Sequence, residues 1–380
     1  MTERIGIVGA GHWSRRLNMG IQRGSPFEIH KTLDVLTYDQ KADLLRDLDI
    51  PRDRHYAIDA GDAIPDEFFE GLDVVQIASP IEYHARQTLR SLEEDVLTIT
   101  EKSFGASREE FDGVVDRLRE DGTRHRCYLH LHYLKKLLTK RMPDVLDRVV
   151  AEHGPVRRVE ATFVEERSEE DRRRSWLFEP GNGGVLLDWI HPIEVLATAA
   201  GARFDGLRSG EGYLVNSDYT ERYPTAARAE YDVSGDVFGE DATATVRVGK
   251  GFRTGTTHKV MRFVFDDARL DFKYVSSEVE FETDHRGEWV WTATDGEERV
   301  VDSGAPEGPI PYMLLIDDIE AALDRGDTGL ELDAVERMFE PVWMFNDAVG
   351  FDDPVTDREA IDAFVDEAIA ATGGATVASR

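Results

Sequence analysis

Short apolar runs alternate with segments of helical periodicity in the first third of this chain, and this alternation restricts its fold more than any other feature. In chain order, these runs and helical segments span residues 5–8, 13–22, 32–37, 40–47, 73–80, 83–92, 96–100, 107–120 and 126–131. Strands and helices that alternate at this spacing are typical of a parallel sheet with right-handed crossovers. The sequence therefore predicts an α/β domain over residues 1–132.

The first apolar run leads directly into a glycine turn. Glycine at such a turn lets the backbone approach a ligand closely, and the amides at the start of the following helix attract a phosphate group. The turn therefore predicts a dinucleotide-binding domain of the Rossmann type, which is a doubly wound parallel sheet. The residues expected beside the pyrophosphate are Gly9, Gly11, His12, Trp13 and Ser14.

The pattern changes after residue 155. One helix is expected over 185–199, most of the remainder has the alternation and turn residues of strands and hairpins, and three helices close the chain. The expected strands and final helices are 156–164, 243–248, 260–265, 269–274, 289–292, 312–323, 333–348 and 357–371. We therefore expect an α+β domain with a large open mixed or antiparallel sheet over 133–355, followed by a C-terminal helix and tail over 356–380.

The composition excludes several classes of function. A formal net charge of −31 with 41% hydrophobic residues indicates a folded protein with an acidic surface, for which nucleic acids and anionic membranes are poor partners. We expect no signal peptide and no membrane span, because no apolar run approaches 18 residues. We expect no internal disulfide, because Cys127 is the single cysteine. Together these expectations indicate a cytoplasmic protein. The acidic surface, with 36 arginines but nine lysines, is typical of proteins that work in molar salt; an ordinary acidic protein is the alternative.

One of the few lysines, Lys102, follows Glu101 at the end of the apolar run 96–100. An ammonium group at the exit of a buried strand must be paired or put to use, because its burial is otherwise costly. Lys102 is therefore a candidate functional residue.

Four elements occur in a recognisable order over nearly the whole length. They are Gly9-Ala-Gly11, Ala78-Ser79-Pro80 with His84, Glu101-Lys102, and Gly183-Gly184 with Asp188 and His191. This order resembles the glucose-fructose oxidoreductase and inositol dehydrogenase family of nicotinamide-dependent sugar dehydrogenases. The resemblance implies a Rossmann domain followed by an α/β domain whose open sheet joins subunits, here into a homodimer or homotetramer. Two features depart from the family pattern: Ser103 replaces the usual proline, and Asp188 and His191 are three residues apart instead of four.

The resemblance also implies roles for these residues. Lys102 would bond the reacting oxygen and the nicotinamide ribose. His191 would be the base that accepts the hydroxyl proton, with Asp188 orienting it or holding a sugar hydroxyl; a pair on a helix surface is the alternative. The further residues expected to bind the cofactor are Ala78, Ser79, Pro80, His84 and Glu101.

A second, local resemblance concerns the substrate. The segments 101–105 and 132–136 are similar to the Glu-Lys-Pro-Phe-Gly and His-Tyr-Leu-Gly-Lys motifs of glucose-6-phosphate dehydrogenases, in which the His and Lys hold the phosphate. Leu131 departs from that pattern, because those enzymes have an Asp there. The resemblance implies a substrate such as glucose 6-phosphate, the alternative being a solvated helix start. The substrate contacts it implies are His132, Tyr133 and Lys136. Apart from the resemblance, we expect Arg174 and Trp176, in a later loop, to contact the substrate as a further clamp.

The choice between NAD and NADP is expected to depend on an acid after the second strand. Asp39 is the candidate to bind the adenosine ribose, which favours NAD, and Asp34 competes for this role. Arg15 and Arg16, beside the glycine turn, would instead favour the 2′-phosphate of NADP.

A histidine-rich stretch, with His125, Cys127, His130 and His132, raises the question of a metal site. No second cysteine or matching carboxylate spacing accompanies it, so no metal is predicted. The sequence thus predicts an NAD(P)-dependent dehydrogenase of a sugar or sugar phosphate. The alternatives are a reductase of another keto or unsaturated substrate on the same fold, and a non-catalytic dinucleotide-binding sensor.

Overall fold

The computed structural model describes residues 2–22, 25–165, 175–179, 182, 184–252, 258–274, 287–293, 298–303, 311–349 and 353–372. The chain forms two compact units, one of residues 1–132 with 310–332 and the other of 133–309 with 333–380. The sequence placed 310–332 in the second domain and set 356–380 apart; the structure differs on both points. None of the helices in these described ranges is long and apolar enough to cross a membrane.

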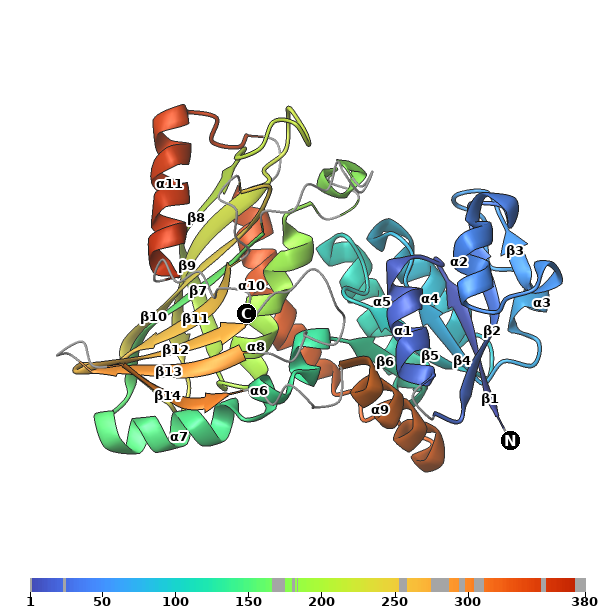
Figure 1. The fold of residues 1–380 in the computed structure, drawn as a ribbon, viewed down its shortest axis with the longest axis horizontal. Helices are drawn as coiled ribbons and strands as arrows, with labels where there is room; N and C mark the ends of the chain where they lie inside the picture. The colour runs from blue at the N-terminus through green and yellow to red at the C-terminus, as the bar shows by residue number, and fades with distance from the viewer. Residues whose placement is uncertain are drawn as a thin grey trace. The chain divides into compact units, whose positions relative to one another are not determined.

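A six-stranded parallel sheet forms the centre of the first unit (Figure 1). Its strands are β1 (Glu3–Val8), β2 (Phe27–Asp34), β3 (His55–Ala57), β4 (Val74–Ile77), β5 (Leu97–Glu101) and β6 (Cys127–His130). They lie in the order β3-β2-β1-β4-β5-β6, with every neighbouring pair parallel. This confirms the predicted Rossmann sheet. The order reverses between β1 and β4, and ligands bind such sheets at the carboxyl ends of the strands beside that reversal.

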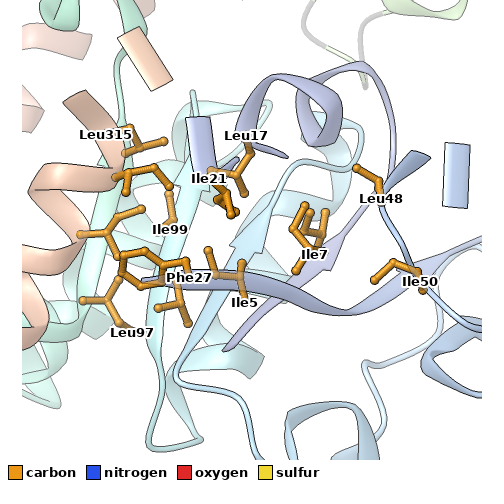
Figure 2. Close-up of a cluster of buried hydrophobic side chains, with 14 of the residues drawn as sticks. Ile5, Ile7, Leu17, Ile21, Phe27, Leu48, Ile50, Leu97, Ile99 and Leu315 are labelled. Atoms are coloured by element: carbon orange, nitrogen blue, oxygen red, sulfur yellow. The ribbon is translucent and has the colours of Figure 1, made fainter. Parts of the chain in front are cut away.

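Helices cover both faces of this sheet because successive strand residues point to opposite sides. Ile5 and Ile7 of β1 pack with Leu17 of α1 and Leu315 of α9 in one apolar cluster (Figure 2). Val8 belongs to a separate cluster with residues of α3 and β4. The helices of this unit are α1 (His12–Ile21), α2 (Ala42–Asp47), α3 (Asp66–Phe69), α4 (His84–Leu92), α5 (Arg108–Glu120) and α9 (Pro311–Arg325).

The second strand was predicted wrongly at residues 32–37. It runs from Phe27 to Asp34, and Val35 and Leu36 after it are 54% and 40% exposed. The buried stretch of β2 includes the polar residues His30 and Lys31, so apolar content underestimates its burial. The short strand β3 had no sequence signal strong enough to predict it.

An eight-stranded mixed sheet forms the centre of the second unit, in the order β14-β13-β12-β11-β7-β10-β9-β8 (Figure 1). Its strands are β7 (Val156–Glu165), β8 (Arg203–Tyr213), β9 (Ala226–Ser234), β10 (Phe238–Lys250), β11 (His258–Val264), β12 (Ala268–Tyr274), β13 (Gly287–Ala293) and β14 (Glu298–Ser303). Only β7 and β10 pair in parallel. The sheet confirms the predicted fold class.

The helices of this unit are α6 (Leu137–Lys140), α7 (Met142–His153), α8 (Leu186–Thr198), α10 (Leu332–Val349) and α11 (Arg358–Ala371). Trp189 fixes α8, since it is fully buried, stacks on Phe345 of α10 with ring centroids 4.4 Å apart, and donates to the Tyr231 hydroxyl at 3.1 Å. Phe364 of α11 stacks on Tyr213 of β8, with centroids 4.2 Å apart. The contacts of Trp189 hold α8, which carries the predicted catalytic pair, and the Phe364 stack holds α11 against β8.

Candidate active site

The glycine turn of the first unit lies at the end of β1. Gly9 donates its amide hydrogen to the Leu33 carbonyl at 2.8 Å and has φ of +85°. A Cβ atom here would lie 2.4 Å from the Ser79 nitrogen, so only glycine fits beside the loop after β4. A Cβ on Gly11 would meet nothing closer than the Gly9 oxygen at 3.9 Å, which leaves room for a ligand. The turn and the start of α1 therefore fit the pyrophosphate of a dinucleotide.

The other residues predicted at this turn differ in how they are used. Ser14 is fully buried, and its hydroxyl accepts a hydrogen bond from the Gly11 amide at 3.0 Å, so it closes the start of α1. Arg15 pairs with Asp47 at 3.1 Å. The side chains of His12, Trp13 and Arg16 lie outside the described part of the structure.

The acid at the end of β2 is Asp34, and the expectation that Asp39 ends this strand is wrong. Asp39 begins the short 3₁₀ helix η1 (Asp39–Lys41) and forms an exposed ion pair with Arg52 at 3.1 Å. Asp34 is 9% exposed, accepts from the Leu36 amide at 3.0 Å and is paired with Lys41, which also donates to the Ala10 carbonyl in the glycine turn. Lys41 thus connects the strand-end acid to the turn.

The loops after β4 and β5 are joined by His84. Its ring is 2% exposed, with Nδ1 2.7 Å from the Ser103 carbonyl oxygen and Nε2 2.8 Å from that of Ser79. His84 was predicted to bind the cofactor, and both of its ring nitrogens lie at backbone carbonyls. Ala78 donates its amide hydrogen to Val8 at 2.8 Å, so the Ala-Ser-Pro segment continues directly beside the glycine turn, with Pro80 at its end.

Lys102 is half-buried directly after the last residue of β5, and its peptide bond to Ser103 is cis. The preceding Glu101 is 7% exposed, and its Oε1 atom accepts from Gln76 Nε2 at 3.1 Å and lies 2.8 Å from His130 Nδ1. These contacts connect the carboxyl ends of β4, β5 and β6. They make Glu101 a support for the strand end that carries Lys102.

In the second unit, α8 brings three titratable residues together. Asp188 Oδ1 lies 3.8 Å from His191 Nε2, and Glu194 Oε1 lies 3.4 Å from His191 Nδ1. Residues three apart lie on one face of a helix, so the spacing of three keeps the predicted pair together. His191 is 6% exposed and Glu194 is fully buried, which argues against the helix-surface alternative. Sequence analysis missed Glu194, which also accepts from the Tyr133 amide at 3.2 Å.

Lys136 does not lie at a solvated helix start. It is 6% exposed, and its Nζ lies over the Tyr133 ring, 4.6 Å from the centroid, and 5.5 Å from that of Tyr274. Tyr133 in turn packs on the His191 ring, with centroids 4.5 Å apart. The predicted substrate residues Tyr133 and Lys136 therefore adjoin the Asp188–His191 pair.

Three charged residues missed by sequence analysis extend this group. Lys250 Nζ lies 2.9 Å from Asp188 Oδ2, and Lys259 Nζ lies 2.5 Å from Glu165 Oε1. Burial tends to raise the pKa of Glu165, but Lys259 and Lys250 together lower it to about 2. Burial tends to lower the pKa of Lys259, yet Glu165 and Tyr133 raise it above its usual value. The sequence signal that could have identified Lys250 and Lys259 is the scarcity of lysine in this chain. Both lie at or near a strand end, as Lys102 does.

The remaining predicted residues divide into those that are described and those that are not. His132 is 9% exposed, with its ring centroid 6.4 Å from that of His130. Arg174, Gly183 and the side chain of Trp176 lie outside the described residues. Within the described ranges, no group of three or more histidine, cysteine or acidic residues could hold a metal ion.

Comparison with known proteins establishes the fold. No family model and no curated protein matches the chain. The chain superposes on an oxidoreductase from Desulfitobacterium hafniense described as NADPH-dependent, with a TM-score of 0.72, 17% identity and coverage of 91% of this chain and 95% of that one. A 3-ketoreductase from Actinomadura kijaniata, in complex with NADP and TDP-benzene, superposes with a TM-score of 0.70 and 16% identity, over 92% of this chain and 98% of that one. An aldose-aldose oxidoreductase from Caulobacter crescentus superposes with a TM-score of 0.69 and 13% identity, over 97% of this chain and 98% of that one.

The chain has the glucose-fructose oxidoreductase-type fold. The likeness extends over both units, which confirms at the level of fold the resemblance drawn from the four sequence elements. At these identities the glucose-fructose oxidoreductase-type fold leaves the substrate and the roles of individual residues to be argued from this chain's own site.

Proposed function

We propose that the protein is an NAD(P)-dependent oxidoreductase that transfers a hydride at a hydroxyl-bearing carbon of a sugar or sugar phosphate. The observation that carries this proposal is the buried group on α8, in which one histidine is flanked by two carboxylates. The open Gly11 turn at the strand-order reversal of the first unit supports a dinucleotide. The named activities of the similar structures, a 3-ketoreductase and an aldose-aldose oxidoreductase, support a sugar substrate.

A bound nicotinamide dinucleotide would supply the hydride acceptor or donor. In our proposal, the Nδ1 hydrogen of His191 is donated to Glu194, which leaves Nε2 to take the proton of the reacting hydroxyl. Asp188, beside Nε2, holds a neighbouring sugar hydroxyl or orients the ring. Lys102 donates to the reacting oxygen and stabilises the negative charge that develops on it. Reduction of a keto sugar uses the same groups in reverse.

The phosphate group of the substrate is the finer part of the proposal. Lys136 and His132 match the phosphate-holding positions of glucose-6-phosphate dehydrogenases, and Lys136 lies beside the Tyr133–His191 stack. An ammonium group held in a largely buried site makes charge-assisted hydrogen bonds that are stronger than those at the surface. Glucose 6-phosphate is therefore the first substrate to test.

The testing experiment is a panel of free and phosphorylated sugars, assayed as alcohols and as keto compounds with both cofactors in molar KCl. Turnover of any sugar supports the proposal, whereas nucleotide binding without turnover of any member supports the sensor alternative. Lys136→Ala should lower kcat/KM for a hexose phosphate by roughly 10-fold or more and leave that for the free hexose unchanged. Lys140→Ala, at an exposed position four residues on, is the matched control.

We also propose that the molecule forms a homodimer or homotetramer in the cytoplasm through the sheet face opposite α8. A row of charges crosses this face, where Arg262 Nη1 lies 3.6 Å from Glu160 and Arg262 Nε lies 2.8 Å from Asp271 on neighbouring strands. Because these charges are already paired, covering them costs less than covering unpaired charges would. Light scattering would give the subunit number, and a monomer at all salt concentrations would contradict this part.

A further inference from the structure

Lys250 connects two carboxylates of the second unit. Its Nζ lies 2.9 Å from Asp188 Oδ2 and 3.7 Å from Glu165 Oε2. Glu165 and Lys250 are register partners on the parallel strands β7 and β10 and are the last residues of both, so the backbone pairing sets them side by side. Lys259 of β11 then pairs with the other carboxylate oxygen of Glu165. Charges of alternating sign thus run from β11 across β7 and β10 to α8.

The arrangement keeps two carboxylates in a site with little water. The side chains of Lys250, Glu165 and Asp188 are 13%, 16% and 21% exposed. Two neighbouring anions repel each other, so Asp188 tends to raise the pKa of Glu165, and the two lysines oppose this by lowering it. Two carboxylates in such a site cannot both stay ionised without a cation between them. Lys250 supplies a cation that reaches both carboxylates, and Lys259 supplies a second one beside Glu165.

The groups that face Asp188 come from several elements. Lys250 of β10 and His191 of its own helix lie within 4 Å of its carboxylate, and Glu165 of β7 acts on it through Lys250. Lys259, which pairs with Glu165, has its Nζ 5.6 Å from the centroid of the Tyr133 ring. Of the two Asp188 oxygens, Oδ2 is near Lys250 and Oδ1 is near His191.

We propose that Lys250 is a positioning residue that holds Asp188 ionised and turned with Oδ1 toward His191, and that Glu165 and Lys259 fix Lys250 in place. This inference rests on the proposed function, because it assigns Asp188 a task beside the base. It adds to that function a residue 62 positions away in the sequence, on a different element.

The first test is the pH profile of kcat in Lys250→Met and Lys250→Arg. Without the cation, one carboxylate retains a proton to higher pH, so kcat of the Met variant should fall by roughly tenfold or more at neutral pH and recover as the pH rises. The Arg variant should retain most of the activity, and KM for the cofactor should be unchanged in both. Lys273→Met, on β12, is the matched control. A loss of kcat with an unshifted profile would overturn the proposal, because a merely structural lysine would give that result.

The second test needs no substrate and so separates this inference from the proposed function. In protein labelled with ¹³C at the aspartate carboxyl carbon, the Asp188 signal is the one absent from Asp188→Asn. It should titrate at higher pH in Lys250→Met than in the wild type; an unchanged titration would overturn the role of Lys250. If the wild type turns over no sugar, the proposed function fails, and this titration still decides the role of Lys250. Lys250→Gln replaces the Met variant if that protein does not fold.

Discussion

Nδ1 of His84 lies 2.7 Å from the backbone carbonyl oxygen of Ser103, the residue directly after Lys102. Nε2 of the same ring lies 2.8 Å from the carbonyl oxygen of Ser79, beside the glycine turn. One buried side chain thus holds together the two loops that carry the proposed cofactor and catalytic contacts of the first unit.

Replacing His84 with Phe should therefore destabilise the first unit. Burial lowers the pKa of His84, so the neutral ring has one N–H to donate, and leaving a buried carbonyl without that donor costs about 1 to 3 kcal/mol. Urea unfolding followed by fluorescence would measure the change. His125→Phe is the control: its Nδ1 donates to the Gly122 carbonyl oxygen at 2.9 Å at an exposed position, and the loss of this bond should cost less than about 0.5 kcal/mol. Equal free energies of unfolding of the two variants would show that the two contacts of His84 do not stabilise the first unit.

Lys102→Met should lower turnover by roughly two or more orders of magnitude and leave the fold intact. The reason is that methionine keeps most of the length of the side chain and removes the charge that stabilises the developing alkoxide. Stopped-flow or steady-state kinetics measures kcat, and circular dichroism checks the fold. Turnover close to that of the wild type would exclude Lys102 from the chemistry.

Cofactor preference should depend on Asp34 and Lys41, and not on Asp39. The paired Lys41 ammonium, which reaches both Asp34 and the Ala10 carbonyl, attracts a 2′-phosphate, whereas an unpaired Asp34 repels one. Lys41→Met should weaken NADP binding relative to NAD by roughly tenfold, and Asp34→Ala should shift the ratio the other way. Calorimetric titration of both nucleotides measures the ratio. If Asp39→Ala changes the NAD/NADP ratio and Lys41→Met and Asp34→Ala do not, Asp39 is the residue that sets the cofactor preference.

Acid should destabilise the protein through Glu165. The pKa of this carboxyl is lowered to about 2 in the folded state, below its ordinary value of 4.5. Its stabilising effect is therefore complete above pH 4.5 and is lost as the pH falls toward 2. Glu165→Gln should be less stable than the wild type at neutral pH, because Lys259 loses its partner, and should lose less stability between these pH values. Parallel pH dependences of the two melting temperatures would contradict this account.

Salt should stabilise the protein strongly. With a formal net charge of −31, repulsion among surface carboxylates acts over the Debye length, which shrinks to about 3 Å in 1 M salt. The melting temperature should rise by roughly 10 °C between dilute buffer and molar KCl. Sodium chloride should act similarly if screening is the cause. A melting temperature independent of salt would refute adaptation to high salt.

The local order of strands, turns and helices could be predicted from the sequence because short-range chemistry specifies it. Gly9 is required where the chain passes within contact distance of Ser79, and Lys102 follows a strand that reads as buried. The three-residue spacing of Asp188 and His191 already placed both on one face of a helix. These features also carried the resemblance that the fold comparison confirms.

The partners of these residues were decided only by tertiary structure. Lys250 reaches Asp188 because β10 pairs in parallel with β7 and ends beside α8, and no local pattern encodes that pairing. The acid at the end of β2 is Asp34 and not Asp39, because the strand begins earlier and buries polar residues that a hydropathy pattern assigns to the surface. The sequence by itself therefore determined Lys102, Asp188 and His191 and the elements on which they lie, but it did not reveal Glu165, Glu194, Lys250 and Lys259. Their charge environment arises from long-range strand register and burial, which only the folded chain establishes.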